Sequence, residues 1–148
     1  LFIACKNNSV PRSASEIAKM FDITTPDVTK GLKKFCEIEK HKNIEINFHI
    51  TETSDFIQRY CNILNISNNI QKIGFYIAKR VKKINILNEN TPSSKAASII
   101  FLLSNKYNLG ITKDIICKEI DISNVTITKA FKKLNDPKIK KVLFMGLE

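Results

Sequence analysis

Apolar residues recur every three or four positions along most of the chain, which is the spacing of amphipathic helices and not of alternating strands. Glycine and proline number only four each, so few positions interrupt such helices. The pattern therefore predicts an all-α fold. The expected helices span residues 13–21, 53–64, 67–86, 112–120 and 123–134, with further helices beginning at residues 25 and 91.

Capping signals mark several of these helix starts. Ser13 followed by Glu16 has the form of a capping box, and Pro26 and Pro92 each follow a threonine at a first helical position. The helix beginning at residue 91 is apolar nearly all round, which predicts a central, buried position. Its apolar residues are Ala96, Ala97, Ile99, Ile100, Leu102 and Leu103.

The same pattern divides the chain into parts. Residues 41–52 are polar and mixed, so we expect a linker between a first unit at residues 1–40 and a second unit at residues 53–134. Residues 135–148 are expected to form a tail without regular structure. The tail would pack through Val142, Leu143, Phe144 and Met145. The first residues resemble the end of a helix, so we treat the chain as a fragment of a longer protein.

The chain contains an internal repeat. Residues 1–35 align on residues 100–134 without a gap, and both copies carry Thr-Lys-x-x-Lys-Lys, at Thr29–Lys34 and at Thr128–Lys133. Each copy reads as the end of a buried helix, a capped helix, a tight turn and a helix with basic outer positions. A short helix, a turn and a second helix with an exposed polar face are typical of helix-turn-helix motifs.

The formal net charge of +10 favours a polyanionic partner, either nucleic acid or an anionic membrane surface, although solubility alone is the simpler explanation. The longest apolar run, Ile99–Leu103, is too short to span a bilayer, so we expect no membrane partner. Between Asp55 and Glu89 there is no acidic residue. Lys72, Lys79 and Lys83 share one face of the helix expected at residues 67–86. This basic stripe predicts a surface for phosphates or an acidic protein, or else a solvated face.

Motifs for catalysis or metal binding are missing from the sequence. The four cysteines are dispersed at positions 5, 36, 61 and 117, and the two histidines share no spacing with them that would suit zinc. Such cysteines fit core positions in a reducing compartment, the cytosol or nucleus. There is no Gly-rich phosphate loop, HExxH motif or nucleophile elbow, so we expect no enzyme, catalytic residue, metal ligand or small-molecule substrate.

Five segments in order resemble the core of transcription factor IIB and its archaeal relatives. The segment Cys5–Arg12 resembles the family's ACR-x-x-GVPR, and Thr53–Cys61 resembles T-x-DF-x-x-RFC. The other three segments are Ser15-Glu16-Ile17, which resembles KEI, Thr91-Pro92 with Ala96-Ala97, which resembles SP-x-S-x-AAAA, and Val125-Thr126-Ile127, which resembles VTIR.

This resemblance implies two tandem cyclin-like repeats of five helices, the first truncated and the second complete. It also implies a general transcription initiation factor that binds the complex of TATA-binding protein and promoter DNA and recruits RNA polymerase, in the nucleus or a viral transcription compartment. The family's zinc ribbon has no counterpart in these residues, so no cofactor is expected. The alternative is a cyclin-type adaptor that activates a protein kinase, against which the basic charge and the VPR and VTI segments argue.

The resemblance also suggests which residues meet the partners. Ile127, Ala130, Phe131 and Leu134 should face inward on the last repeat helix. The positions of Val125 and Thr128 read bases in the family, but Thr128 replaces an arginine, which weakens the case for reading guanine. Phosphate contacts are predicted for Lys129, Lys132, Lys113 and Arg12, and contacts to the TATA-binding protein for Lys30 and Lys33.

Overall fold

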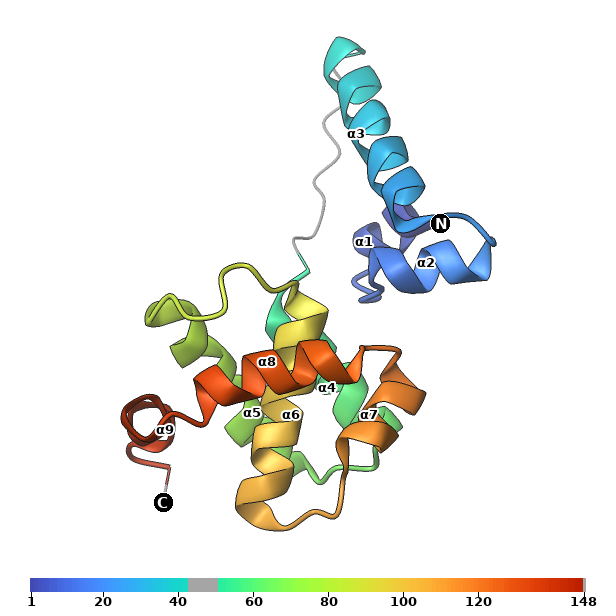
Figure 1. Ribbon diagram of the computed structural model, residues 1–148. Helices are drawn as coiled ribbons and strands as arrows, with labels where there is room; N and C mark the ends of the chain where they lie inside the picture. The colour runs from blue at the N-terminus through green and yellow to red at the C-terminus, as the bar shows by residue number, and fades with distance from the viewer. Residues whose placement is uncertain (43–50, 148) are drawn as a thin grey trace. The chain divides into compact units, whose positions relative to one another are not determined.

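The computed structural model describes residues 1–42 and 51–147, and all regular secondary structure in these ranges is helical. The prediction of an all-α fold is confirmed. The chain forms two compact units, Leu1–Thr51 and Glu52–Glu148 (Figure 1). The segment predicted as a linker overlaps residues 43–50, which lie outside the described residues.

The first unit contains α1 (Phe2–Asn7), α2 (Ala14–Met20) and α3 (Thr25–His41). Its core is small: Ile17, Ala18 and Val28 are buried, and only partly buried apolar residues pack around them. The capping box predicted at Ser13 is present. Its Oγ accepts a hydrogen bond from the Glu16 N–H (3.1 Å), and Glu16 Oε2 accepts one from the Ser13 N–H (2.8 Å). This reciprocal pair fixes the start of α2.

The second unit is built around α6. Its helices are α4 (Thr53–Ile63), α5 (Asn68–Lys83), α6 (Pro92–Tyr107), α7 (Lys113–Ile120), α8 (Asn124–Leu134) and α9 (Pro137–Phe144). The apolar residues of α6 predicted to be central are all fully buried, and α4, α5, α7 and α8 pack against that helix (Figure 1). Each fully buried leucine or isoleucine contributes roughly 1.5–3 kcal/mol. Helix α6 supplies four of them (Ile99, Ile100, Leu102 and Leu103), more than any other helix of this unit.

Gly74 allows α5 to approach its neighbours closely. A Cβ atom at this position would lie 3.1 Å from Ile57 Cγ2 on α4 and 3.4 Å from Leu103 Cδ1 on α6. Both neighbours are fully buried and well packed, so neither can move far to accommodate a side chain. The absence of a side chain at Gly74 therefore sets the spacing of three helices.

The internal repeat is visible in the backbone. Helix α7 begins 99 residues after α2, and helix α8 begins 99 residues after α3. The paired positions are the N-cap residues Ser13 and Thr112, the N-cap residues Thr24 and Ser123, the left-handed residues Ser9 and Asn108, and the left-handed residues Asp22 and Asp121. A positive φ is uncommon for residues with a side chain, so its recurrence at the same offset supports a duplicated unit.

The prediction that residues 135–148 lack regular structure is wrong, because Pro137–Phe144 form α9. Asp136 caps this helix by accepting hydrogen bonds from the N–H groups of Lys138 (3.0 Å) and Ile139 (3.3 Å). Of the four residues predicted to pack, Leu143 and Phe144 are buried, whereas Val142 and Met145 are exposed. The helix predicted to reach residue 86 ends earlier, at Lys83.

Candidate nucleic-acid interface

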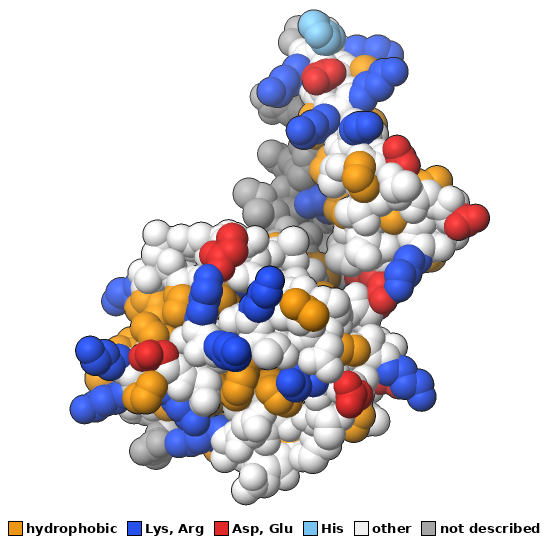
Figure 2. Space-filling view, in the orientation of Figure 1, with side chains coloured by type: hydrophobic (Ala, Val, Ile, Leu, Met, Phe, Trp, Pro, Cys, Tyr) orange, Lys and Arg blue, Asp and Glu red, His pale blue; other side chains and the backbone are white. Residues whose placement is uncertain are grey.

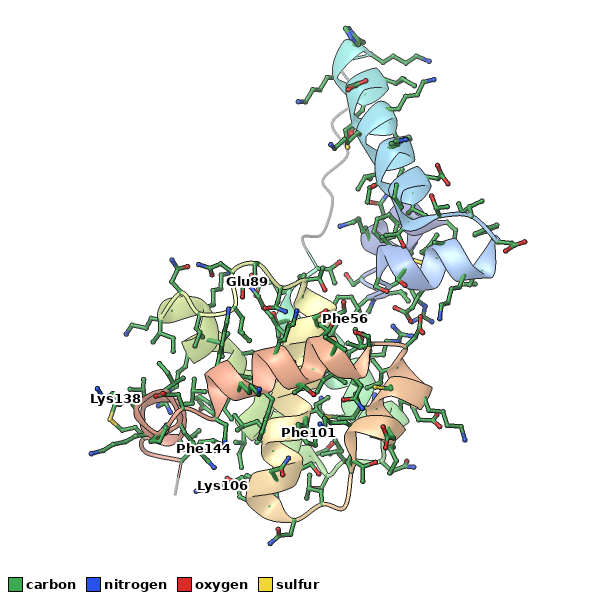
Figure 3. The ribbon with its side chains drawn as sticks, in the orientation of Figure 1. Phe56, Glu89, Phe101, Lys106, Lys138 and Phe144 are labelled. Carbon is green, nitrogen blue, oxygen red and sulfur yellow. The ribbon has the colours of Figure 1, made fainter. Side chains whose placement is uncertain are left out.

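Helices α7 and α8 form the helix-turn-helix that the sequence predicted. Asp121 ends α7 in a left-handed conformation (φ 61°), and Ser123 caps α8 by accepting a hydrogen bond from the Thr126 N–H (3.2 Å). On the inner face of α8, Ile127, Ala130 and Leu134 are buried. The half-buried ring of Phe131 packs edge-on against Phe101 of α6 at 4.8 Å between ring centroids. Figure 3 labels Phe101 on α6. The predicted inner face is confirmed, so the opposite face of α8 is oriented outward.

The outer face of α8 is cationic and open to solvent. Val125 is 62% exposed, and Lys129 and Lys132 are also exposed. Among the described residues neither lysine is paired with a carboxylate, whereas the adjacent Lys133 forms an ion pair with Glu89. That pairing lowers the pKa of Glu89. The charges of Lys129 and Lys132 therefore remain available to an anionic partner.

Four polar side chains join the start of α7 to the start of α8. Lys113 Nζ donates to Thr128 Oγ1 (3.2 Å), and Thr128 Oγ1 donates to Asn124 Oδ1 (3.2 Å). Asn124 Nδ2 in turn donates to Asp114 Oδ1 (3.1 Å). Lys113 Nζ also lies 5.8 Å from the centroid of the Phe101 ring, within range of a cation–π interaction. This hydrogen-bonded group holds Thr128 in one orientation on the outer surface.

The sequence predicted Lys113 and Thr128 as separate contacts, and the structure brings them together. Asn124 and Asp114, which were not among the predicted contacts, belong to the same hydrogen-bonded group. The spacing of Asn124 and Thr128, four residues apart on one helix face, was a detectable signal. The hydrogen bonds that join Thr128 and Asn124 to α7 depend on the angle between α7 and α8, which cannot be predicted from the sequence of either helix alone.

Three predicted site residues lie in the first unit. Lys30 and Lys33 are exposed on α3. Arg12 is half-buried in the loop before α2, where its Nη1 donates to the carbonyl oxygen of Pro11 (3.2 Å). The two lysines are therefore accessible on α3, whereas Arg12 is held partly against its own backbone.

The basic stripe on α5 is exposed as the sequence predicted. Lys72, Lys79 and Lys83 are all exposed, and none is paired with a carboxylate among the described residues. Lys82, outside the stripe, instead pairs with Glu52 (2.7 Å). Tyr76, which the pattern of lysines alone does not indicate, lies on the same face and is 55% exposed. An exposed aromatic ring thus accompanies the three cationic side chains.

The excess of positive charge is concentrated in the second unit. Residues 52–148 carry 16 Lys+Arg against 8 Asp+Glu, whereas residues 1–51 carry 8 against 6. Figure 2 shows more lysine and arginine than acidic side chains on the face crossed by α8. Long-range attraction of a polyanion would therefore act mainly on the unit that presents the helix-turn-helix.

The described residues offer little for catalysis or metal binding. Burial raises the pKa of the Cys61 thiol to about 11, which keeps it protonated at neutral pH and unsuited to nucleophilic chemistry. Among residues 1–42 and 51–147, no three histidine, cysteine or acidic side chains are grouped so that they could hold a metal ion. No helix in these ranges has the length and apolar character needed to cross a membrane.

Comparison with known proteins places these features in a family context. Residues 46–137 match the family model described as the transcription factor TFIIB repeat. The chain is 33% identical over 140 residues to a transcription initiation factor IIB-like protein of Acanthamoeba polyphaga mimivirus, covering 90% of this chain and 30% of that protein. It is 27% and 25% identical over 132 residues to transcription initiation factor IIB of Drosophila melanogaster and Homo sapiens, covering 89% of this chain and 40% of each relative. The chain thus spans less than half the length of these curated relatives.

Proposed function

The chain belongs to the transcription factor TFIIB repeat family, and from this premise we propose that it binds the complex of TATA-binding protein and promoter DNA and bridges it to a DNA-dependent RNA polymerase. The proposal makes it a binding module of transcription initiation, not an enzyme, acting in the nucleus or a viral transcription compartment. The interface uses lysines, hydroxyls and one apolar side chain, and it needs no cofactor.

The observation that carries this proposal is the outer face of α8. A second helix of a helix-turn-helix enters the major groove with its outward side chains. Lys129 and Lys132, both exposed and unpaired among the described residues, are suited to neighbouring phosphates. Val125, at 62% exposure, can reach the methyl group of a thymine. Lys113 approaches the same face through its hydrogen bond to Thr128.

Contacts to the TATA-binding protein are assigned to the first unit. Lys30 and Lys33 are exposed on α3, which repeats the position of α8, so the duplicated helix presents lysines to a second partner. Arg12 is assigned to DNA phosphates near this helix. Its guanidinium keeps further donors beyond the one bonded to Pro11.

Salt dependence tests the proposed phosphate contacts directly. Each neutralised phosphate contributes a slope of about −0.9 to the plot of log affinity against log salt concentration. Replacing Lys129 and Lys132 together by alanine should therefore make the slope less steep by about 2. A slope unchanged by the double replacement would remove α8 from the DNA interface.

Thr128→Arg should increase discrimination for guanine. A bidentate arginine–guanine pair is worth about 1–3 kcal/mol, which Thr128 cannot supply. In competition assays with promoter duplexes that differ by one G·C pair upstream of TATA, the variant should prefer the G·C duplex roughly tenfold more than the parent chain does. Lys129→Arg, one position further along α8, is the control and should leave the preference unchanged. Equal preferences in parent and Thr128→Arg would argue against base contact at this position.

The basic stripe is proposed as a second contact for DNA phosphates. Lys72 and Lys83 are 11 residues apart, which corresponds to about 16 Å along a helix and matches the spacing of a few consecutive phosphates. Replacing Lys72, Lys79 and Lys83 by alanine should lower the affinity of the full complex while leaving the preference for promoter sequence intact. Measuring both quantities on the same duplexes checks this; altered sequence preference would contradict a purely phosphate-binding role.

A further inference from the structure

The exposed face of α5 combines an aromatic ring with cationic side chains. Tyr76 is 55% exposed and lies between Lys72, four residues before it, and Lys79, three residues after it. Lys83 extends the same face by a further turn. Residues three and four apart are neighbours on a helix surface. The ring therefore lies within the basic stripe and is flanked by positive charge on both sides.

No described ring or cationic side chain covers the Tyr76 ring. Elsewhere in the described part of the chain, lysine or arginine side chains lie over the rings of Phe2, Tyr60, Phe101 and Phe144. Tyr76 makes no such contact within residues 1–42 and 51–147, although lysines flank it, and no second ring packs against it there. The ring is therefore available to stack on a planar group of a partner.

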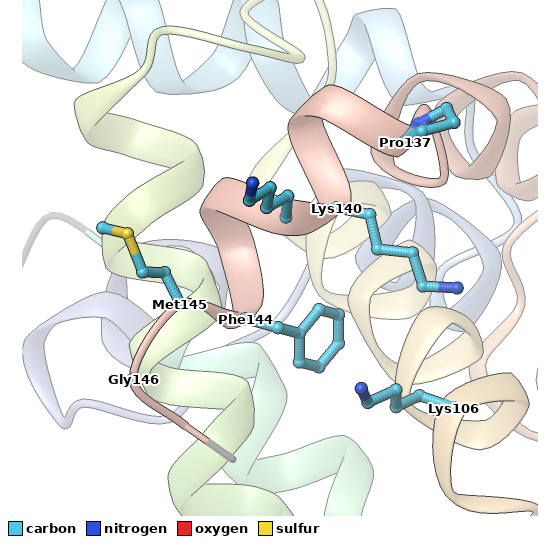
Figure 4. A pocket seen from close by; sticks show the side chains of 7 residues that line it. Lys106, Pro137, Lys140, Phe144, Met145 and Gly146 are labelled. Atoms are coloured by element: carbon cyan, nitrogen blue, oxygen red, sulfur yellow. The ribbon is translucent and has the colours of Figure 1, made fainter.

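The surroundings of the stripe add to its positive charge. The sequence has no acidic residue between Asp55 and Glu89, so α5 itself carries none. Helix α9 packs against α5 and contains three lysines and no acidic residue. One of them, Lys140, lines a pocket of about 390 Å³ between α9 and the end of α6, which Lys106 also lines (Figure 4). This uncompensated charge favours an extended polyanion.

Duplex DNA would use only part of the α5 face. Its phosphates can meet the lysines, but its bases are stacked on one another and offer no free ring face to a side chain on a helix surface. In a single strand the bases are accessible. Proteins bind single strands by combining positive charge along the backbone with aromatic rings on which bases stack. The α5 face supplies both components.

We propose that the exposed face of α5 binds single-stranded DNA, with one base stacked on Tyr76 and the adjoining phosphates on Lys72, Lys79 and Lys83. The choice of DNA as the strand rests on the proposed function, in which the chain acts at a promoter that an RNA polymerase opens. The inference deepens the phosphate contact proposed for the basic stripe, because it names the form of DNA that the stripe prefers. Binding is sequence-tolerant, since every base has a face on which to stack.

The stacking contact is tested with the full chain and a fluorescent oligothymidylate of about 12 nucleotides, without TATA-binding protein. Anisotropy at about 50 mM salt measures the affinity. Tyr76→Ala should weaken binding at least about fivefold, as expected for the loss of one base–aromatic stack. Tyr76→Phe keeps the ring and should stay within about twofold of the parent chain. Tyr76→Leu keeps apolar volume without a ring and should lose as much as Tyr76→Ala.

A second readout reports stacking directly. The chain contains no tryptophan, so Tyr76→Trp places a single one at the proposed site. Stacking of a thymine on an indole ring quenches its emission, and the fluorescence of this variant should therefore fall as oligothymidylate is added. Met20→Trp is the matched control, because Met20 is similarly exposed, at 64%, but lies on α2 in the first unit. Its emission should change little over the same titration.

The lysines are tested through salt dependence. Replacing Lys72, Lys79 and Lys83 by alanine should make the salt slope of oligothymidylate binding less steep by about 2, at about 0.7 for each single-strand phosphate. The same replacement should weaken binding of a duplex of equal length, whereas Tyr76→Ala should leave duplex binding unchanged. That difference separates the stacking contact from general attraction between charges.

The proposal is overturned if no oligothymidylate binds, if Tyr76→Ala binds it as tightly as the parent chain, or if Tyr76→Trp is quenched no more than Met20→Trp. Duplex binding that falls equally in Tyr76→Ala would also overturn it, as would tighter binding of an oligouridylate, which would assign the face to RNA. These measurements omit TATA-binding protein and leave α8 unchanged, so their failure is distinct from a failure of promoter binding through α8.

Discussion

A chain carrying Lys129→Glu and Lys132→Glu is expected to lose roughly 2–3 kcal/mol of promoter affinity in the presence of TATA-binding protein, about 30- to 150-fold. Each replacement removes an attraction to a phosphate and adds a repulsion of similar size. Both side chains are exposed and unpaired among the described residues, so the loss should fall on binding and leave folding intact. Titration of a labelled TATA duplex measures it.

Helix α9 offers a closely matched control for this experiment. Lys138 and Lys141 are also exposed and three residues apart, so Lys138→Glu with Lys141→Glu gives the same net charge and the same spacing. This control should weaken promoter binding only because it lowers the net positive charge of the protein, and therefore by less than the α8 variant does. If both double variants lose affinity equally, the protein attracts DNA by net charge and α8 has no special role.

Leu103→Ala is expected to destabilise the second unit by roughly 2–5 kcal/mol, the range measured for buried leucines whose removal leaves a cavity. Leu103 is fully buried in α6 and borders Gly74 on α5. The well-packed surroundings should limit collapse into the cavity, which favours a large effect. Because whole domains are stable by only about 5–15 kcal/mol, this loss should be plain in urea unfolding followed by circular dichroism.

Val125→Ala is the contrasting variant for stability. Val125 is 62% exposed, so its truncation should change the free energy of unfolding by less than about 0.5 kcal/mol. Its effect is expected instead in promoter binding. A small loss for Leu103→Ala, below about 1 kcal/mol, would mean that α6 is not the centre of the core.

Much of the fold could be predicted from the sequence because its signals are local. Three of these signals each lie within one helix, and the structure contains all three. They are the apolar residues around α6, the capping box at Ser13 and the start of α6 at Pro92. The duplication also predicted the helix-turn-helix, because a repeat carries the same helix boundaries and turns in both copies.

Features that depend on distant partners were missed. Asp136 and Pro137 do signal a helix start, but an eight-residue helix is marginal without tertiary contacts. The stability of α9 comes from burial of Phe144 and from Arg80, which lies 63 residues from its acceptor Leu143. The bond between Lys113 and Thr128 likewise depends on how α7 and α8 cross. The pocket beside α9 could not be predicted for the same reason.

The most direct test of promoter binding through α8 is a gel shift on a TATA-box duplex, with and without TATA-binding protein, across a series of salt concentrations. The account predicts a supershifted complex that requires both proteins and weakens steeply as salt increases, because phosphate contacts release counterions. The Lys129→Glu, Lys132→Glu chain should give no supershift under conditions in which its α9 control does. Absence of any supershift for the parent chain at about 50 mM salt, where phosphate contacts are strong, would contradict the proposed function.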